Sequence, residues 1–237
     1  PITRLKEDFY LINKEDMNQY SYWTWGTPTA GWDMLLRGDG YLLFIETNDD
    51  GYVNIEDWNN VDTDRWIKIL NENAQEELEK NKGKDIDLAT KFTWVKKPKL
   101  DRKKNMVFYA YEVLWNDGVT SLESRTLILA KNGYSTLVFT TTDEETPYSQ
   151  LANKFSNKAE TFKFNEGSTY SEYKTGDKIA AVGIGALLAT TLGVKALSPG
   201  LLATLGKLLA KFWFILLLPF IFIGKLIDSL KTKRKRR

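Results

Sequence analysis

Residues 106–140 read MVFYAYEVLWNDGVTSLESRTLILAKNGYSTLVFT, three runs of apolar and β-branched residues separated by Asp117-Gly118 and Asn132-Gly133. Asx-Gly pairs supply the positive φ angles that two-residue hairpin turns require. The stretch therefore predicts a three-stranded antiparallel meander. A third pair, Asp39-Gly40, lies between two further apolar runs and predicts another hairpin nearer the N-terminus.

One long helix is expected between these hairpins, with Thr63 as its N-cap. Its expected buried face, spaced at the helical period, consists of Trp66, Ile69, Leu70, Ala74 and Leu78. Weaker helices are expected at residues 14–22, opened by Asn13, and at residues 146–158. A succession of strands with few helices predicts an α+β domain over residues 1–175, in which helices pack against one antiparallel sheet.

The C-terminal part of the chain is strongly apolar. Residues 208–227 contain only two charged residues, both lysines, and about 20 apolar residues cross the ~30 Å hydrocarbon core of a bilayer. We therefore predict a transmembrane helix within residues 201–230 that anchors the domain. Lys207 and Lys211 lie one helical turn apart and can extend to the headgroups, while Trp213 lies near the interface. A helix buried in the core of the domain is the alternative.

A basic tail closes the sequence. Although the formal net charge is only +2, residues 231–237 contain six cations, namely Lys231, Lys233, Arg234, Lys235, Arg236 and Arg237. A basic cluster directly after an apolar span is typical of a cytoplasmic anchor that contacts anionic membrane lipid. A nucleic-acid-binding tail is the alternative, and the adjoining apolar segment makes it the weaker one.

Residues 176–200 form a second apolar segment whose membrane relation the sequence leaves open. Its small residues recur every four positions, a pattern that lets helices approach closely; they are Ala181, Gly185, Ala189 and Gly193. Residues 179–197 could therefore mediate homo-oligomerisation, although an Ala/Gly-rich helix without that role has the same pattern. If the segment spans, domain and tail share one side of the membrane. If it re-enters or lies on the surface, they lie on opposite sides.

The chain contains no His and no Cys. This composition excludes Ser-His-Asp and Cys-His catalysis, disulfide bonds, and metal sites built on imidazole or thiolate. No cofactor is expected, and only a carboxylate-based calcium site remains to be weighed.

Residues 46–64 contain seven acidic side chains and no basic one. Placed on an EF-hand loop, the segment has Gly51 at the sharp turn and oxygen ligands at Glu46, Asn48, Asp50 and Asp57. Glu at the first position, the short Asp at the twelfth and a strand-like run before the loop weaken this metal hypothesis. A polar turn is the favoured interpretation, and a calcium-responsive or carboxylate-dependent enzyme centred on this segment is the alternative function.

Two other clusters have an ordinary and a functional interpretation. Residues 91–104 carry seven cations against only Asp101, which suits phosphate binding. A solvated hairpin flank, or contact with anionic headgroups, is favoured over nucleic acid. Trp23, Trp25 and Trp32 lie close to two tyrosines, and this aromatic group predicts either a core corner or, if exposed, a partner surface.

An ordered series of segments resembles a known bacterial family, domain of unknown function 2167. The segments are Asp50-Gly51-Tyr52-Val53, Trp94 to Asp101, Met106 to Ala110, residues 125–139, Phe164-Asn165-Glu166-Gly167, Tyr170, and Asp177-Lys178-Ile179-Ala180-Ala181. The resemblance covers roughly residues 30–237. The order of elements is also similar to the PsbP-like α/β sandwich group, whose members are mostly non-catalytic accessory proteins.

The resemblance implies a membrane-anchored protein of Gram-negative bacteria, with its sheet domain in the periplasm and its tail in the cytoplasm, at the inner membrane. Family members usually begin with a signal peptide, so a chain that begins at Pro1 is expected to be processed or truncated. We therefore expect a non-enzymatic binding or scaffold domain of the envelope with an unidentified protein partner.

Overall fold

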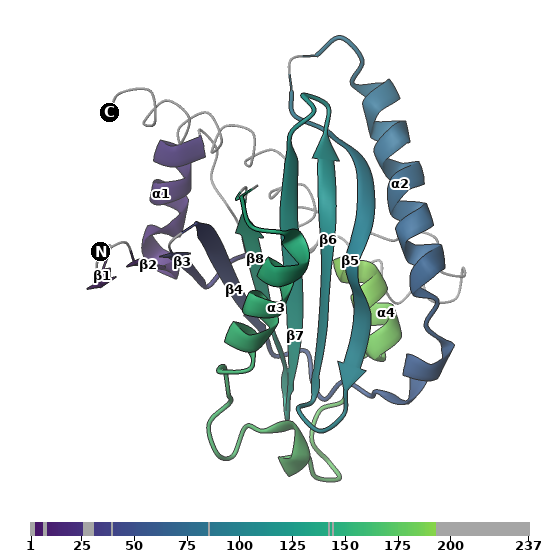
Figure 1. The fold of residues 1–237 in the computed structure, drawn as a ribbon. Helices are drawn as coiled ribbons and strands as arrows, with labels where there is room; N and C mark the ends of the chain where they lie inside the picture. Colours follow the sequence, from purple (N-terminus) through teal and green to yellow (C-terminus); the bar gives the residue numbers. More distant parts are fainter. Residues whose placement is uncertain are drawn as a thin grey trace.

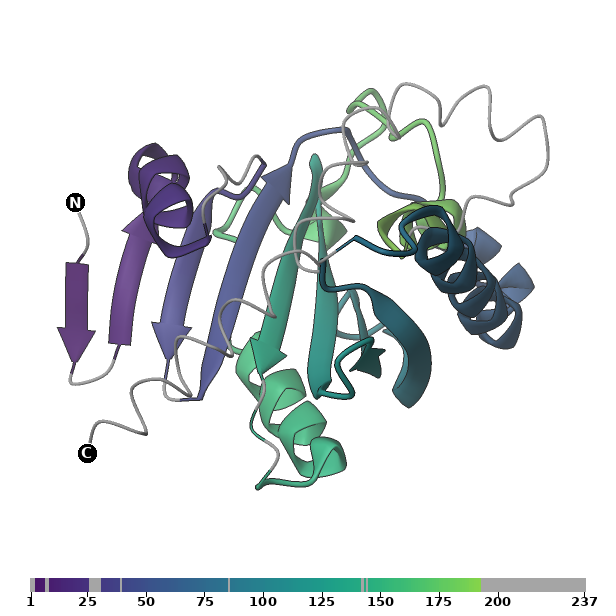
Figure 2. The ribbon, with the colours of Figure 1, turned by 90° about the horizontal axis from the view of Figure 1, so that it is seen from above.

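The computed structural model describes residues 3–6, 9–25, 31–38, 40–84, 86–141, 143 and 145–192. These residues form one eight-stranded antiparallel sheet in the order β1-β2-β3-β4-β8-β7-β6-β5, with helices on both faces (Figures 1 and 2). The strands are β1 (Thr3–Lys6), β2 (Phe9–Asn13), β3 (Met34–Gly38), β4 (Tyr41–Asn48), β5 (Ala89–Asp101), β6 (Met106–Trp115), β7 (Thr120–Ala130) and β8 (Gly133–Thr141). The helices are α1 (Lys14–Trp25), α2 (Thr63–Lys80), α3 (Tyr148–Ala159) and α4 (Ile184–Thr191), with single 3-10 turns η1 (Glu56–Asn60) and η2 (Tyr170–Glu172).

The expected antiparallel sheet with packed helices is confirmed. Strands β6, β7 and β8 form the predicted meander, and β3 and β4 form the predicted hairpin. Gly40 and Gly118 have φ angles of +73° and +81°, as the turn chemistry requires. Gly133 differs, because its φ is not positive. A Cβ there would lie 1.8 Å from the Asn48 carbonyl oxygen, so the close approach of two backbones requires glycine.

The two faces of the sheet bury separate cores. Tyr109, Tyr111 and Val113 of β6 point to the face of the sheet that carries α1, α2 and α4, whereas Phe108 and Ala110 point to the face that carries α3. Figure 2 shows this division, with α3 on one side of the sheet and α1, α2 and α4 on the other. The alternation follows from the two-residue period of a strand, which sends successive side chains to opposite faces.

Helix α2 forms where its period predicts, but its cap is one residue earlier than expected. Asp62 is the N-cap, and its carboxylate accepts the Arg65 N–H at 2.9 Å. Trp66, Leu70 and Ala74 are buried as predicted, since they share one stripe of the helix.

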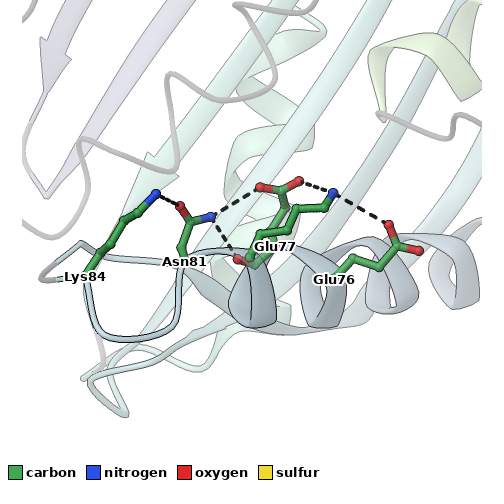
Figure 3. Close-up of polar contacts among 5 residues, drawn as sticks. Glu76, Glu77, Asn81 and Lys84 are labelled. Carbon is green, nitrogen blue, oxygen red and sulfur yellow. Dashed lines mark hydrogen bonds and ion pairs between the residues drawn. The ribbon is translucent and has the colours of Figure 1, made fainter.

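The C-terminal end of α2 is closed by side chains (Figure 3). The Asn81 amide donates to the Glu77 carbonyl at 2.9 Å, and Lys84 donates to the Asn81 side chain at 2.9 Å. Lys80 forms ion pairs with both Glu76 and Glu77. The Asn81 amide thus caps one carbonyl of the last turn, and the other contacts join side chains around it.

Helix α4 is the largest departure from the sequence-based expectation. The apolar segment after residue 175 was expected to be a separate membrane-associated element. Instead, Ile184, Leu187 and Leu188 are at most 3% exposed and belong to the core beneath α2. The fold therefore extends to Leu192, because these apolar side chains are buried against the sheet.

The predicted membrane anchor lies outside the described residues. This applies to residues 201–230, to the basic tail at 231–237 and to Gly193. Within the described ranges, no helix has both the length and the apolar character needed to cross a bilayer.

The cap of α2 gives a direct test of local structure. Replacing Asp62 by Ala should lower the free energy of unfolding by about 1 kcal/mol, because the Arg65 N–H loses its acceptor. The neighbouring Thr63→Ala should cost less than about 0.5 kcal/mol. Urea denaturation measures both, and the reverse order of effects would contradict the cap assignment.

Candidate functional site

The acidic loop after β4 runs alongside residues 178–184. The Tyr52 N–H donates to the Lys178 carbonyl at 2.8 Å, and the Ala180 N–H returns a bond to the Tyr52 carbonyl at 2.9 Å. Gly51 has a φ of +115°, and a Cβ there would lie 2.8 Å from the Ala180 nitrogen. Only glycine fits both requirements, so this loop is shaped to receive the chain that leads into α4.

A stack of three tyrosines holds the same junction. The Tyr52 ring lies between Tyr170 and Tyr173, with centroid distances of 4.4 and 4.1 Å. The Tyr170 hydroxyl donates to the Val53 carbonyl at 2.7 Å, and burial raises the pKa of this phenol. Segments far apart in the sequence, including residues 50–53 and 177–181, thus meet at one end of the sheet.

The predicted metal ligands serve separate contacts at this junction. Asn48 is buried and accepts the Asp50 N–H at 3.0 Å, while Asp57 accepts the Gly185 N–H at 3.0 Å. Glu46 lies on β4 and also has interaction partners. In the parts of the chain that the structure describes, no three acidic side chains gather as a metal site. Calcium binding by these residues, the less favoured interpretation of the sequence, remains untested.

The small-residue stripe packs within the chain. A Cβ on Gly185 would lie 2.9 Å from Val61 Cγ2 and 3.1 Å from Asp57 Oδ2. Ala189 is fully buried in the core, whereas Ala181 is exposed. Two of the three described members therefore bring α4 close to η1 and to the sheet. A homo-oligomer formed through residues 179–197 remains untested.

A buried charged cluster lies where the end of α4 meets the sheet. Arg125 and Glu123 on β7 form an ion pair at 2.6 Å, with side chains only 3% and 0% exposed. Arg125 Nη1 also donates to the Thr191 carbonyl at 2.6 Å. Because this carbonyl belongs to the last turn of α4, the guanidinium stabilises the negative end of the helix dipole.

Two tyrosines on β6 complete the cluster. The Tyr111 hydroxyl donates to the Glu123 oxygen that binds Arg125, and the Tyr109 hydroxyl lies 3.5 Å from Thr191 Oγ1. Burial raises the pKa of both phenols, so both remain protonated donors. Burial also opposes the Arg125 charge, but the Glu123 carboxylate overcomes this effect and raises the pKa of Arg125.

Sequence reasoning missed this cluster, although a signal was present. Glu123 and Arg125 are two residues apart in an otherwise uncharged strand, which places both charges on the same face. Glu123 Oε2 has no hydrogen-bond partner among the described residues. The cluster is thus a buried polar contact that attaches α4 to the sheet within an apolar core, and it is not part of an open pocket.

A basic groove of about 740 Å³ lies between the β5–β6 hairpin and α3. Its lining residues are Lys96, Lys97, Lys99, Leu100, Asp101, Arg102, Lys103, Met106, Phe108, Ser156 and Glu160. The predicted basic segment therefore becomes one wall of a hollow, and we call this site the basic groove.

Both acidic side chains of the basic groove are already engaged. Lys104 pairs with Glu160 at 2.6 Å and lies 3.9 Å from Asp101. The Lys104 and Lys103 N–H groups donate to Asp101 and, with the nearby lysine charges, lower the pKa of its carboxyl. Lys104 thus partly offsets the charge of both carboxylates.

The predicted aromatic group is divided by the fold. Trp32 is buried against the Phe44 ring at 5.2 Å, which makes it part of the core. Tyr22 on α1 is 63% exposed. The side chains of Trp23 and Trp25 lie outside the described residues.

Breaking the buried pair should be costly. Arg125→Met should lower the free energy of unfolding by about 3–5 kcal/mol, because the Glu123 charge remains buried without its partner. The double variant Glu123→Gln/Arg125→Met should recover most of that loss, since Gln removes the charge and keeps an acceptor for Tyr111. Urea denaturation compares the two, and equal losses would contradict the role of the charge.

Substitutions at two residues of the small-residue stripe should change the stability of the domain by different amounts. Gly185→Leu should cost about 1–3 kcal/mol in urea denaturation, because the added side chain collides with Val61 and Asp57. Ala181→Leu, at an exposed position of the same stripe, should change stability by less than about 0.5 kcal/mol. Equal effects at the two positions would argue against docking of α4 on η1.

Comparison with known proteins gives a family but no described activity. The chain is similar to the solution structure of cyanobacterial PsbP (CyanoP) from Synechocystis sp. PCC 6803, with 11% identity and a TM-score of 0.39, over 69% of this chain and 90% of that one. No inference about fold or function follows from a likeness this distant, and no curated protein matches the chain. A family model described as protein of unknown function (DUF2167) matches residues 2–221. The resemblance noted in the sequence is thereby confirmed, and the chain belongs to the DUF2167 family.

Proposed function

We propose that this chain is a non-enzymatic domain, anchored in a bacterial membrane, that binds a partner or scaffolds an assembly of the envelope. The observation that carries the proposal is the docking of residues 177–192 on the sheet, which fixes the point from which the apolar C-terminal segment departs. A tethered domain needs such a firm connection, because any pull on the anchor acts on the last docked turn.

The contacts at that turn suit this role. The Thr191 carbonyl is held by a buried guanidinium, and the Ala180 and Ile184 N–H groups are hydrogen-bonded to the loop after β4. Side-chain burial and backbone pairing therefore secure the segment at both ends of α4.

The docking also favours one of the two membrane arrangements left open by the sequence. A segment that packs in the core of the domain is not available to cross a bilayer. This supports a single span at residues 208–227, with the sheet domain in the periplasm and the basic tail in the cytoplasm at the inner membrane.

The predicted span can be tested in the full chain. Leu216→Arg/Leu217→Arg places two charges at the centre of the span, at about 2.5–3.5 kcal/mol each, and should shift the protein out of carbonate-washed membranes. Leu230→Arg, beyond the predicted span, should leave it there.

Sidedness is read from a protease applied to intact spheroplasts. The sheet domain should be digested while an epitope after Arg237 is protected. A wild-type chain that is extracted by carbonate, or an epitope digested together with the domain, would contradict the proposed anchor or its orientation.

A further inference from the structure

We propose that the basic groove binds the phosphate headgroup of an anionic phospholipid. This inference rests on the proposed anchor, which would hold the groove near a membrane, and it deepens the proposed function by naming a ligand class.

The rim of the basic groove offers cations that form no ion pair with a described acid. Lys97 pairs with Asp64 at 2.6 Å, and Lys96 donates to the Asn153 side chain. Lys99, Arg102 and Lys103 form no ion pair within the described ranges, and all three are exposed. Three free cations on one short hairpin match a phosphate or a small group of phosphates.

The floor of the basic groove is apolar. Met106 and Phe108 lie beneath the cations and retain at most 9% of their exposure. The Lys96 ammonium lies 5.6 Å from the centre of the Phe108 ring. A hollow with cations at the rim and apolar side chains below fits a ligand that joins an anionic group to an apolar one, as a phospholipid does.

Edge pairing with a peptide strand suits this wall of the groove less well. Pro98 lacks an N–H, and β5 shifts register between Trp94 and Lys96 and again between Lys96 and Lys99. An incoming strand would therefore find a broken edge, because both features remove regular ladder partners.

The chain between the domain and the predicted span is long enough to bring the basic groove to the bilayer. Residues 193–207 separate Leu192 from that span and reach about 50 Å when fully extended. The radius of gyration of a domain of this size is about 16 Å. A tether of that length keeps any face of the domain at a high effective concentration near the lipid surface.

The test uses the full chain in nanodiscs of phosphatidylcholine, with or without phosphatidylglycerol. Amine labelling followed by mass spectrometry gives the reaction rates of Lys99 and Lys103, with Lys68 and Lys91 as internal references outside the groove. We expect labelling of Lys99 and Lys103 to slow about fivefold or more in the anionic discs only. Arg102→Gln should abolish most of this protection, whereas Arg65→Gln, an equal loss of charge on exposed α2, should not.

Two soluble probes added to the neutral discs distinguish other anions. Equal protection by inorganic phosphate would assign the basic groove to free phosphate, and equal protection by oligoglutamate would assign it to an acidic protein; either result overturns the lipid proposal. Equal slowing at Lys68 and Lys91 would reduce the effect to general attraction and would also overturn it. Incorporation into discs of phosphatidylcholine alone tests the proposed membrane anchor independently of the groove. A chain that does not incorporate contradicts the anchor, whereas a chain that incorporates but shows no protection of Lys99 and Lys103 contradicts only lipid binding by the groove.

Discussion

The ion pair between Arg125 and Glu123 attaches the last turn of α4 to the sheet. The docking of α4 and the proposed tethering of the domain both depend on this attachment. Arg125 donates to Glu123 on its own strand and to the Thr191 carbonyl of α4. Burying two charges is costly unless they are paired and hydrogen-bonded, and here Tyr111 adds a further donor to the carboxylate. The specific geometry of the pair fixes where α4 docks, and hence where the apolar C-terminal segment begins.

Local chemistry allowed much of the fold to be predicted from the sequence. Asx-Gly turns define β3–β4 and β6–β7, and the apolar period of α2 defines its buried stripe, because each signal lies within a few residues. Helix α4 was misread because a helix that is apolar on all sides suits a protein core as well as a membrane. Only long-range contacts distinguish the two, such as the bond from Gly185 to Asp57, 128 residues away in sequence.

Strand β5 shows the same limit in the candidate site. Its lysines and Pro98 hide the alternation of a strand, and its outer edge is completed by another element. The Asn71 side chain exchanges two hydrogen bonds with the Phe92 backbone, and Gln75 donates to the Thr90 carbonyl. Sequence reasoning therefore identified the basic residues of the groove but not the hollow that they form with α3. In the acidic segment, Asp57 and Asp62 have structural partners that the sequence could not reveal.

Native-state hydrogen exchange on the full chain in phosphatidylcholine nanodiscs tests the central claim, that α4 is docked on the sheet through Arg125. The account predicts that the Leu187 and Leu192 amides, bonded to Gly183 and Leu188, exchange as slowly as amides of β6. It further predicts that Arg125→Met accelerates these two amides before those of the sheet. Fast exchange at α4 in the wild-type chain, or protection that Arg125→Met leaves unchanged, would contradict it.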